Sequence, residues 1–213
     1  MQHTINRMIK LLNFLLVLFF LIGVYFMFFS NESGGVLIST GLDNLKYFTV
    51  LSNFLCGIVA IVNEFRYLAR KSPVSVTWKL IAASEVGLTF FIVAFFLAPL
   101  YPDLNMYERG NLFFHLLCPV VAMLEMYLIG MTSEKIPLRT TMLAMIPTFL
   151  YASWYLANNL IHGIGEWPHT NDFYGFLNWG LPFGLVIFVV SVLLTWAIAL
   201  MLRLPNALAK RKK

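Results

Sequence analysis

The stretch Leu11–Phe29, LLNFLLVLFFLIGVYFMFF, carries no charged residue over a length of 19 residues. An α-helix needs about 20 predominantly apolar residues to cross the hydrocarbon core of a bilayer, which is roughly 30 Å thick. The stretch is too long for the apolar region of a cleavable signal peptide, and its bulky end, Phe26–Phe29, offers no small-residue cleavage site. We therefore expect a retained membrane span over about residues 9–29.

Five further runs along the chain have the same character. The six predicted spans cover about residues 9–29, 47–62, 77–100, 111–131, 140–157 and 179–202. The fifth run is interrupted by Pro147 and turns polar at Asn158 and Asn159. None of the runs shows the alternation with period two that is typical of membrane β-barrels. The sequence therefore predicts an all-α, polytopic bundle of six transmembrane helices, formed by residues 1–213 as a single integral membrane domain.

The composition excludes most other classes of protein. Hydrophobic residues make up 60% of the 213 positions and charged residues only 12%, whereas a soluble domain carries about 25% charged residues. Soluble enzyme folds, nucleic-acid-reading domains and disordered scaffolds are therefore excluded. Cys56 and Cys118 both fall inside predicted spans and lack the spacing of metal ligands. We expect no disulfide framework, no metal and no cofactor.

The distribution of basic residues predicts the orientation of the bundle. Thirteen of the 15 Lys and Arg residues lie on the side of the two chain ends, and only Lys46 and Arg109 lie on the other side. Basic residues are enriched on the cytoplasmic side of membrane proteins. We therefore expect both termini in the cytoplasm, and a multi-pass location in a cell membrane, namely a bacterial plasma membrane. The net charge of +5 then reflects topology and not nucleic-acid binding.

Polar side chains are costly inside a membrane, so their positions carry most of the functional information. Thr49 and Asn53 are one helical turn apart in the second span, and Thr49 lies three residues past Lys46, about 4.5 Å below the outer interface. His115 lies four residues past Asn111 in the fourth span, about 6 Å below the same interface. A hydroxyl and an imidazole at equal depth are what a nucleophile and its general base require. Packing against neighbouring helices is the alternative explanation for such residues.

A third group of polar residues follows at the end of the fifth span. Its members share one helical face: Tyr151, Tyr155, Asn158, Asn159 and His162. An interfacial aromatic belt with a glycine-rich turn explains the aromatic residues, but it does not explain two Asn and two His so close together. We therefore predict a polar pocket near the outer leaflet, lined by Asn53, Asn159, His162 and Trp167.

Two carboxylates lie deeper in the predicted spans. Glu85 lies about 12 Å and Glu125 about 9 Å from the inner interface, at 1.5 Å per residue. An isolated carboxylate in a membrane takes up a proton or finds a partner, so these two either share a proton or bind neighbouring hydroxyls. They form a structural polar clamp or, alternatively, a proton step in transport.

Three pieces of the chain carry a resemblance to a known family. They are Lys46-Tyr47-Phe48-Thr49; His115 followed by Pro119 and Leu124-Glu125-Met126; and Tyr151–Pro168, with Trp154, His162 and Trp167. Together they resemble the androgen-induced and androgen-dependent tissue-factor-pathway-inhibitor-regulating proteins, which are described as intramembrane threonine hydrolases of fatty acid esters of hydroxy fatty acids. The resemblance implies Thr49 as the nucleophile and His115 as its base. Uncharacterised six-span bacterial membrane proteins resemble the chain as well, and they imply the fold without an activity.

Three functions remain open at this point. The first is an intramembrane hydrolase of lipid esters, in which Asn53, Asn159 or His162 stabilises the oxyanion formed by attack of Thr49. The second is a non-catalytic membrane protein that binds lipid or a partner. The third is a small proton-coupled transporter built on Glu85 and Glu125, which the lack of an internal repeat disfavours. The expected partners are membrane lipids and a lipid-ester substrate, and the oligomeric state stays open.

Overall fold

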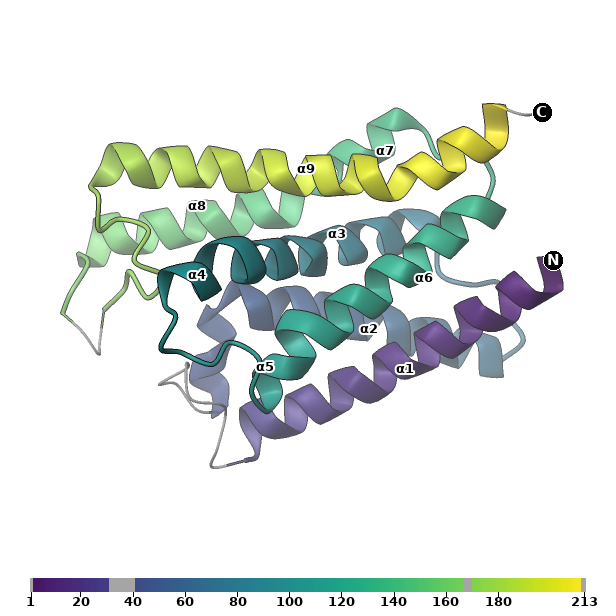
Figure 1. Ribbon diagram of the computed structural model, residues 1–213, viewed down its shortest axis with the longest axis horizontal. Helices are drawn as coiled ribbons and strands as arrows, with labels where there is room; N and C mark the ends of the chain where they lie inside the picture. The colour runs from purple at the N-terminus through teal and green to yellow at the C-terminus, as the bar shows by residue number, and fades with distance from the viewer. Residues whose placement is uncertain (1, 31–40, 167–169, 212–213) are drawn as a thin grey trace.

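The computed structural model describes residues 2–30, 41–166 and 170–211. Within these ranges every regular element is a helix (Figure 1). Trp167, which the sequence places in the polar pocket, lies outside the described residues. The all-α fold class that the apolar runs predict is confirmed.

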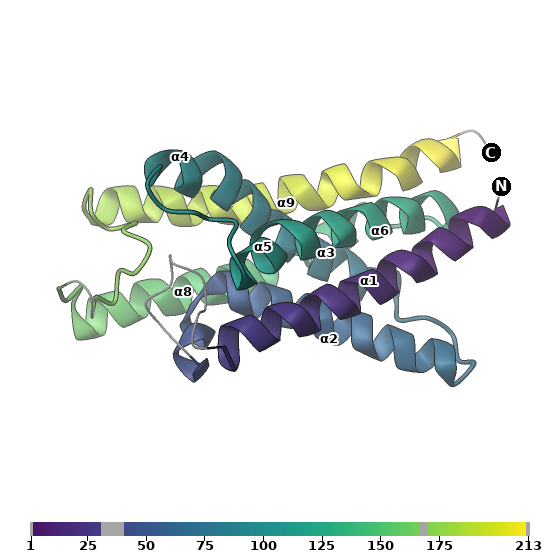
Figure 2. The same ribbon diagram turned by 60° about the horizontal axis from the view of Figure 1, so that its bottom comes forward.

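Among the described residues, five helical runs are long and apolar enough to cross a membrane. They are α1 (Gln2–Phe28), α2 (Phe48–Leu68), α3 to α4 (Val76–Leu100), α5 to α6 (Gly110–Thr132) and α9 (Leu181–Arg211). Each run overlaps one predicted span, and all five run along the length of the bundle in Figures 1 and 2. The chain is therefore a multi-pass helical membrane protein.

The predicted span at residues 140–157 differs from the other five. It consists of two helices, α7 (Leu138–Met142) and α8 (Met145–His162), with a turn between them. Pro147 in the first turn of α8 has no N–H to donate to the Leu143 carbonyl, and this accounts for the break. The polar end of α8 lowers its hydropathy, and α8 is not among the five membrane-length runs. The number of six spans therefore stays a prediction.

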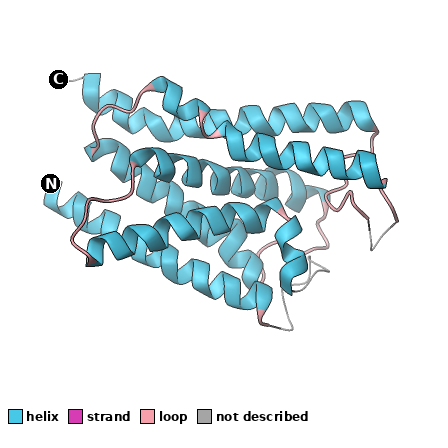
Figure 3. Cartoon of the chain, turned by 180° about the vertical axis from the view of Figure 1, so that it is seen from behind, coloured by secondary structure: helices cyan, strands magenta, loops and turns pink. Residues whose placement is uncertain are grey.

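The arrangement of α8 and of the chain ends completes the bundle. Helix α8 lies beside α9 and runs antiparallel to it (Figure 1). Figure 3, the view from behind, shows that loops and turns join the described helices. Both chain ends lie at the same end of the bundle in Figures 1 and 2. Which compartment faces that end stays a prediction.

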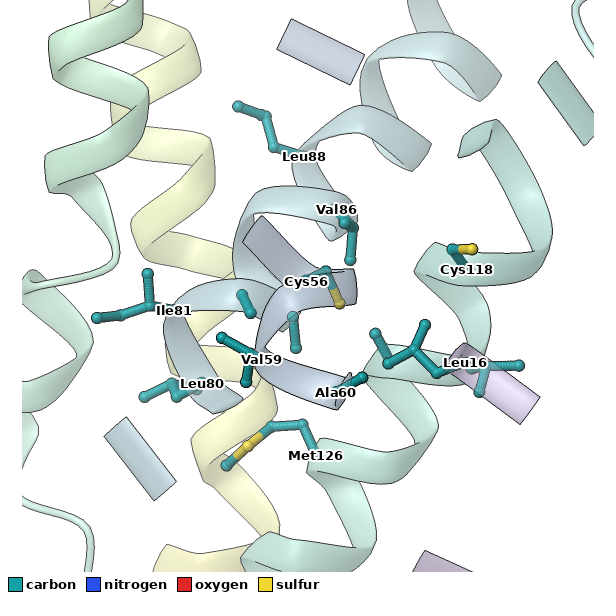
Figure 4. Close-up of a cluster of buried hydrophobic side chains, with 14 of the residues drawn as sticks. Leu16, Cys56, Val59, Ala60, Leu80, Ile81, Val86, Leu88, Cys118 and Met126 are labelled. Carbon is teal, nitrogen blue, oxygen red and sulfur yellow. The ribbon is translucent and has the colours of Figure 1, made fainter. Parts of the chain in front are cut away.

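Helix α3 (Val76–Ile92) forms the centre of the bundle. It packs against α2, α6 and α9, and its residues are buried without a break from Lys79 to Thr89. A helix that is largely apolar on all sides is typical of such a central position. Figure 4 shows side chains from α2, α3 and α6, among them Cys56, Val86 and Met126, gathered in this core.

Two of the membrane-length runs contain a π turn, in which a helix widens locally. The segment η2 (Val93–Leu97) comes just before Pro99, and η3 (Phe113–Leu117) comes just before Pro119. Proline has no N–H, and its ring collides with the carbonyl four residues earlier in a regular helix. A π turn at this place accommodates the ring. For Pro119 the carbonyl in question belongs to His115, so the widened turn lies at a predicted catalytic residue.

Candidate functional site

Thr49 is the second residue of α2, at the end of the bundle opposite the chain termini (Figure 1). The short 3₁₀ helix η1 (Gly41–Lys46) and Tyr47 lead into it. The backbone carbonyl of Thr49 accepts hydrogen bonds from Ser52 and Asn53. Its side-chain hydroxyl has no hydrogen-bond partner among the described residues. The hydroxyl therefore lies in the first turn of a helix, near the positive end of the helix dipole.

Two tyrosines hold the start of α2 in place. The Tyr151 hydroxyl donates a hydrogen bond to the Lys46 carbonyl at 2.7 Å, and the Phe48 N–H donates one to the Tyr174 oxygen at 2.9 Å. The second bond satisfies one of the N–H groups that the first turn of a helix leaves unpaired. Thr49 is thus positioned by side chains from α8 and from the loop that follows it.

His115 lies in the π turn η3 and is 5% exposed. Its Nδ1 lies 2.6 Å from the backbone carbonyl oxygen of Met106, in the loop between α4 and α5. A carbonyl oxygen can only accept, so Nδ1 carries the hydrogen in this contact. In the neutral imidazole Nε2 then holds the lone pair, and Nε2 is the ring nitrogen that can take up a proton.

Thr49 and His115 line the same cavity, which has a volume of about 490 Å³. The rest of its wall comes from the two loops at this end of the bundle and includes Tyr101, Leu104, Met106, Ile164, Tyr174 and Asn178. Both residues are fully described, and no hydrogen bond joins their side chains. Hydrogen bonds between a nucleophile and its base are often long before substrate binds. The structure therefore brings the two predicted catalytic residues to one cavity without a direct contact between them.

The predicted oxyanion donors do not line this cavity. The two amide hydrogens of Asn53 are used on the Thr49 carbonyl at 2.7 Å and the Phe114 carbonyl at 3.0 Å. Asn159 likewise donates to the carbonyls of Tyr155 and Asn171. His162 is exposed at the end of α8. The amides of Asn53 and Asn159 serve hydrogen bonds that fix helices and loops. Spacing along the sequence cannot distinguish this role from a catalytic one.

The two carboxylates lie in separate networks, so the expectation that they share a proton is wrong. Glu125 accepts two hydrogen bonds from the Lys79 ammonium, at 2.8 and 2.9 Å, and Lys79 also donates to Asn13. Glu85 accepts a hydrogen bond from the Thr148 hydroxyl at 2.9 Å. The alternative expectation, that a carboxylate binds a neighbouring hydroxyl, describes Glu85. Lys79, counted by its sequence position as an interfacial cation, is in fact a buried partner of Glu125 that is 6% exposed.

Three residues of the cavity were not found from the sequence. Met106 contributes a backbone carbonyl, for which no side-chain signal exists. Asp172 is buried and accepts hydrogen bonds from the Tyr155 hydroxyl and, at 2.9 Å, from the Leu177 N–H, so it fixes the loop after α8. Its signal in the sequence is a single carboxylate directly before the aromatic segment Phe173–Phe176. Tyr174 is explained equally well by an interfacial aromatic belt, so its residue type gives no separate signal.

The Tyr174 hydroxyl has the properties of a hydrogen-bond donor to a ligand. Burial raises its pKa from 10 to about 12, so the phenol keeps its proton at neutral pH. Its oxygen accepts the Phe48 N–H at 2.9 Å, and Tyr174 lines the cavity. Tyr174 thus places a protonated hydroxyl on this cavity, whereas Asn53 and Asn159 do not line it.

The described residues contain no cluster of three His, Cys, Asp or Glu side chains that could hold a metal ion. No family model, no curated protein and no solved structure matches the chain. The chemistry of the cavity therefore has to be argued from its own residues.

Proposed function

We propose that the protein is an intramembrane hydrolase of lipid esters, with Thr49 as the nucleophile and His115 as the general base. One observation carries the proposal. A threonine hydroxyl without a hydrogen-bond partner in the described part of the chain and a histidine whose Nδ1–H is held by a carbonyl line the same cavity. A base that is oriented by a third group, next to a hydroxyl, is the general arrangement of nucleophilic catalysis. The resemblance of Lys46–Thr49 and of the segment after His115 to the intramembrane threonine hydrolases supports the same roles.

The proton route follows from the histidine tautomer. Thr49 Oγ1 attacks the ester carbonyl carbon while its proton passes to Nε2 of His115. The C–O bond of the ester then breaks, the alcohol leaves with the proton from Nε2, and the acyl group remains on Thr49. A water molecule, deprotonated by the same Nε2, hydrolyses the acyl-threonine and restores both residues. The Met106 carbonyl holds the imidazole in the required tautomer throughout.

Two features stabilise the negative charge that forms on the carbonyl oxygen. Thr49 lies in the first turn of α2, where the helix dipole is positive. The Tyr174 hydroxyl lies at the same helix start and lines the cavity. A single oxyanion donor is worth about 3 to 4 kcal/mol of transition-state stabilisation.

The substrate class follows from the setting of the cavity. It lies at the loop end of a helical membrane bundle, where aromatic and aliphatic side chains such as Leu97, Leu104 and Phe173 form much of its wall. An apolar wall with few polar groups suits the acyl chain of a lipid ester. The outer leaflet of a bacterial plasma membrane as the site of action, with cytoplasmic termini, is part of the proposal and rests on the distribution of basic residues.

The test measures ester hydrolysis by the purified full chain in nanodiscs, with a panel of long-chain fatty acid esters. We expect turnover by the wild type that is lost in Thr49→Ala and in His115→Ala. Matched controls are Thr132→Ala, on α6 outside the cavity, and His162→Ala, at the exposed end of α8; both should retain turnover. Turnover that persists in a folded Thr49→Ala variant would contradict the proposal.

One observation favours a second candidate, a membrane protein that binds lipid in this cavity without cleaving it. The side chains of Thr49 and His115 are not hydrogen-bonded to each other. In that case the wild type binds the same esters, with an affinity that changes on cavity substitutions, but releases no fatty acid.

A further inference from the structure

Glu85 is a second buried polar group with an unusual environment. It is the tenth residue of α3, and its side chain is completely buried. One oxygen, Oε2, accepts a hydrogen bond from Thr148 of α8, which itself lies 2.9 Å from the hydroxyl of Thr195 of α9. The other oxygen, Oε1, is buried and has no hydrogen-bond partner among the described residues. Unpaired buried polar atoms are rare in folded proteins, and each requires an explanation.

Glu85 also lines a cavity of about 480 Å³ between α2 and α8. The cavity wall is mainly apolar and includes Leu51, Leu55, Pro147, Leu150 and Trp154. Thr148, which binds Oε2, is not part of this wall, and Oε1 is the carboxyl oxygen that has no partner among the described residues.

The cavity lies next to the surface that this bundle presents to lipid. Its wall residues Leu51, Leu150 and Trp154 are 39%, 62% and 45% exposed. An exposed apolar surface on a membrane-spanning bundle faces the hydrocarbon chains of the bilayer. A molecule dissolved in the bilayer can therefore enter this cavity from the side of the bundle without passing through water.

The hydrogen bonds define the chemical form of the site. No cationic side chain pairs with Glu85 within the described ranges, and a charge without a partner is strongly disfavoured in such surroundings. The group is therefore a carboxylic acid with one O–H. In the arrangement in which Thr148 donates to Oε2, the acid hydrogen lies on Oε1. Ser52 and Tyr151 also line the cavity, but their hydroxyls already bond within the protein, so of these three groups the Glu85 O–H is the donor left for a ligand.

We propose that this cavity is a second ligand site, which takes up from the bilayer a neutral, chain-like molecule with one carbonyl group. The Glu85 O–H donates a hydrogen bond to the carbonyl oxygen, and the apolar wall surrounds the chain. The cavity volume lies within the range of about 300 to 1,000 Å³ that small-molecule sites occupy. A cation fits poorly, because no second charged residue lines the cavity. The site shares no residue with the Thr49 cavity, so it does not depend on hydrolysis there.

The first experiment uses dicyclohexylcarbodiimide, an apolar reagent that reacts with carboxylic acids in apolar surroundings. The acid O–H adds across one C=N bond, and the adduct rearranges to a stable N-acylurea without a leaving group. We expect the wild-type protein in nanodiscs to gain the mass of one carbodiimide, located on Glu85 by peptide mass spectrometry. A water-soluble carbodiimide at equal concentration should leave Glu85 unmodified. Glu125, whose two oxygens are held by Lys79, is the internal control and should stay unmodified.

The second experiment tests for the carbonyl group. A long-chain methyl ketone should slow the labelling of Glu85 about tenfold more than the alkane of equal length, because only the ketone accepts the hydrogen bond. Equal protection by the alkane would overturn the proposal, since the carbonyl would then contribute nothing. Absence of labelling at Glu85, or labelling of Glu125 in its place, would overturn it as well.

Two variants allow the proposal to be tested even if the protein does not fold without the Glu85 carboxyl group. Glu85→Gln removes the reactive acid and should abolish the adduct. Leu51→Trp leaves the acid in place but fills the cavity from its rim, and we expect about tenfold slower labelling. Leu160→Trp, an equally bulky change at an exposed position of α8 outside the cavity, is the matched control and should label as the wild type does. Equal labelling rates in the two tryptophan variants would contradict a site in this cavity.

Discussion

His115 Nδ1 lies 2.6 Å from the backbone carbonyl oxygen of Met106, and this contact assigns separate tasks to the two ring nitrogens. Nδ1 carries the hydrogen and holds the ring against the loop between α4 and α5. Nε2 carries the lone pair and is the atom that can accept a proton. The structural and the chemical contribution of His115 therefore reside on different atoms and can be separated by substitution.

We predict that His115→Asn separates these contributions. The Asn amide nitrogen occupies nearly the position of Nδ1 and can donate to the Met106 carbonyl, but no atom replaces Nε2. Ester hydrolysis should fall about 10²- to 10⁴-fold, the usual contribution of a general base, while thermal unfolding in detergent stays close to that of the wild type. His115→Leu should lose hydrolysis and, in addition, about 1 to 3 kcal/mol of stability, because it leaves the Met106 carbonyl unpaired. Equal stability of the two variants would show that the contact with Met106 does not hold the loop.

Pro119 should control the direction of His115 through the π turn. In Pro119→Ala the residue regains an N–H that can bond to the His115 carbonyl, and the helix can close to regular α geometry. The fold should persist or gain stability, while hydrolysis falls about 100-fold, the effect of a displacement of about 1 Å in a catalytic group. Pro205→Ala, in α9 and outside the cavity, is the control and should leave hydrolysis unchanged. Measurement of turnover and unfolding temperature for both variants checks this prediction.

Tyr174→Phe should lower hydrolysis about 10²- to 10³-fold if the phenol is the oxyanion donor.

Because the pKa of Tyr174 is raised from 10 to about 12, the folded protein keeps a proton that the unfolded chain releases near pH 10. The stability that this group contributes is complete below pH 10 and is lost as the pH rises from 10 to about 12. Spectroscopic titration of tyrosinate, as the difference between wild type and Tyr174→Phe, should show one phenol that ionises near pH 12. Ionisation near pH 10 would contradict the burial of this hydroxyl.

The Lys79–Glu125 pair should behave as a buried ion pair whose members depend on each other. Lys79→Met leaves the Glu125 carboxylate without its cation and should destabilise the protein by about 3 to 5 kcal/mol. The double change Lys79→Met with Glu125→Leu removes both charges and should recover most of that loss. Thermal unfolding of the two variants in the same detergent measures the difference. If the double variant is no more stable than Lys79→Met, the pair is not the origin of the loss.

The helical bundle could be predicted from the sequence because apolar length alone determines where a chain can cross a bilayer. The predicted spans 9–29, 47–62, 77–100, 111–131 and 179–202 each overlap one membrane-length helical run, but α1 begins before residue 9, and α2 and α9 extend beyond residues 62 and 202. The run at 140–157 was the weakest, since Pro147 and the two Asn at its end reduce both its continuity and its hydropathy. The structure divides this run between α7 and α8.

The candidate site was predictable only in part. The depth of a residue below the membrane interface follows from its spacing along the helix. This spacing predicts that Thr49 and His115 lie at about the same depth. The hydrogen-bond partners of Asn53, Glu85 and Lys79 depend on how the helices pack, and the hydropathy of the sequence carries no information about that packing. The Met106 contact involves a backbone carbonyl and leaves no trace in the choice of side chain. The π turns leave a signal in the sequence, because one proline lies four residues after His115 and another lies just after Leu97. This signal can be recognised once the consequence of a missing N–H is considered.

Activity-based labelling is the measurement that tests the role of Thr49 most directly. A fluorophosphonate probe reacts when an activated hydroxyl attacks phosphorus and fluoride leaves, so it requires no knowledge of the natural ester. We predict that the detergent-solubilised wild type is labelled at Thr49, that Thr49→Ser retains labelling, and that Thr49→Ala and His115→Asn lose it. Labelling of a folded Thr49→Ala variant at the wild-type level, or no labelling of the wild type, would contradict an activated Thr49 and leave lipid binding without hydrolysis as the function of this cavity.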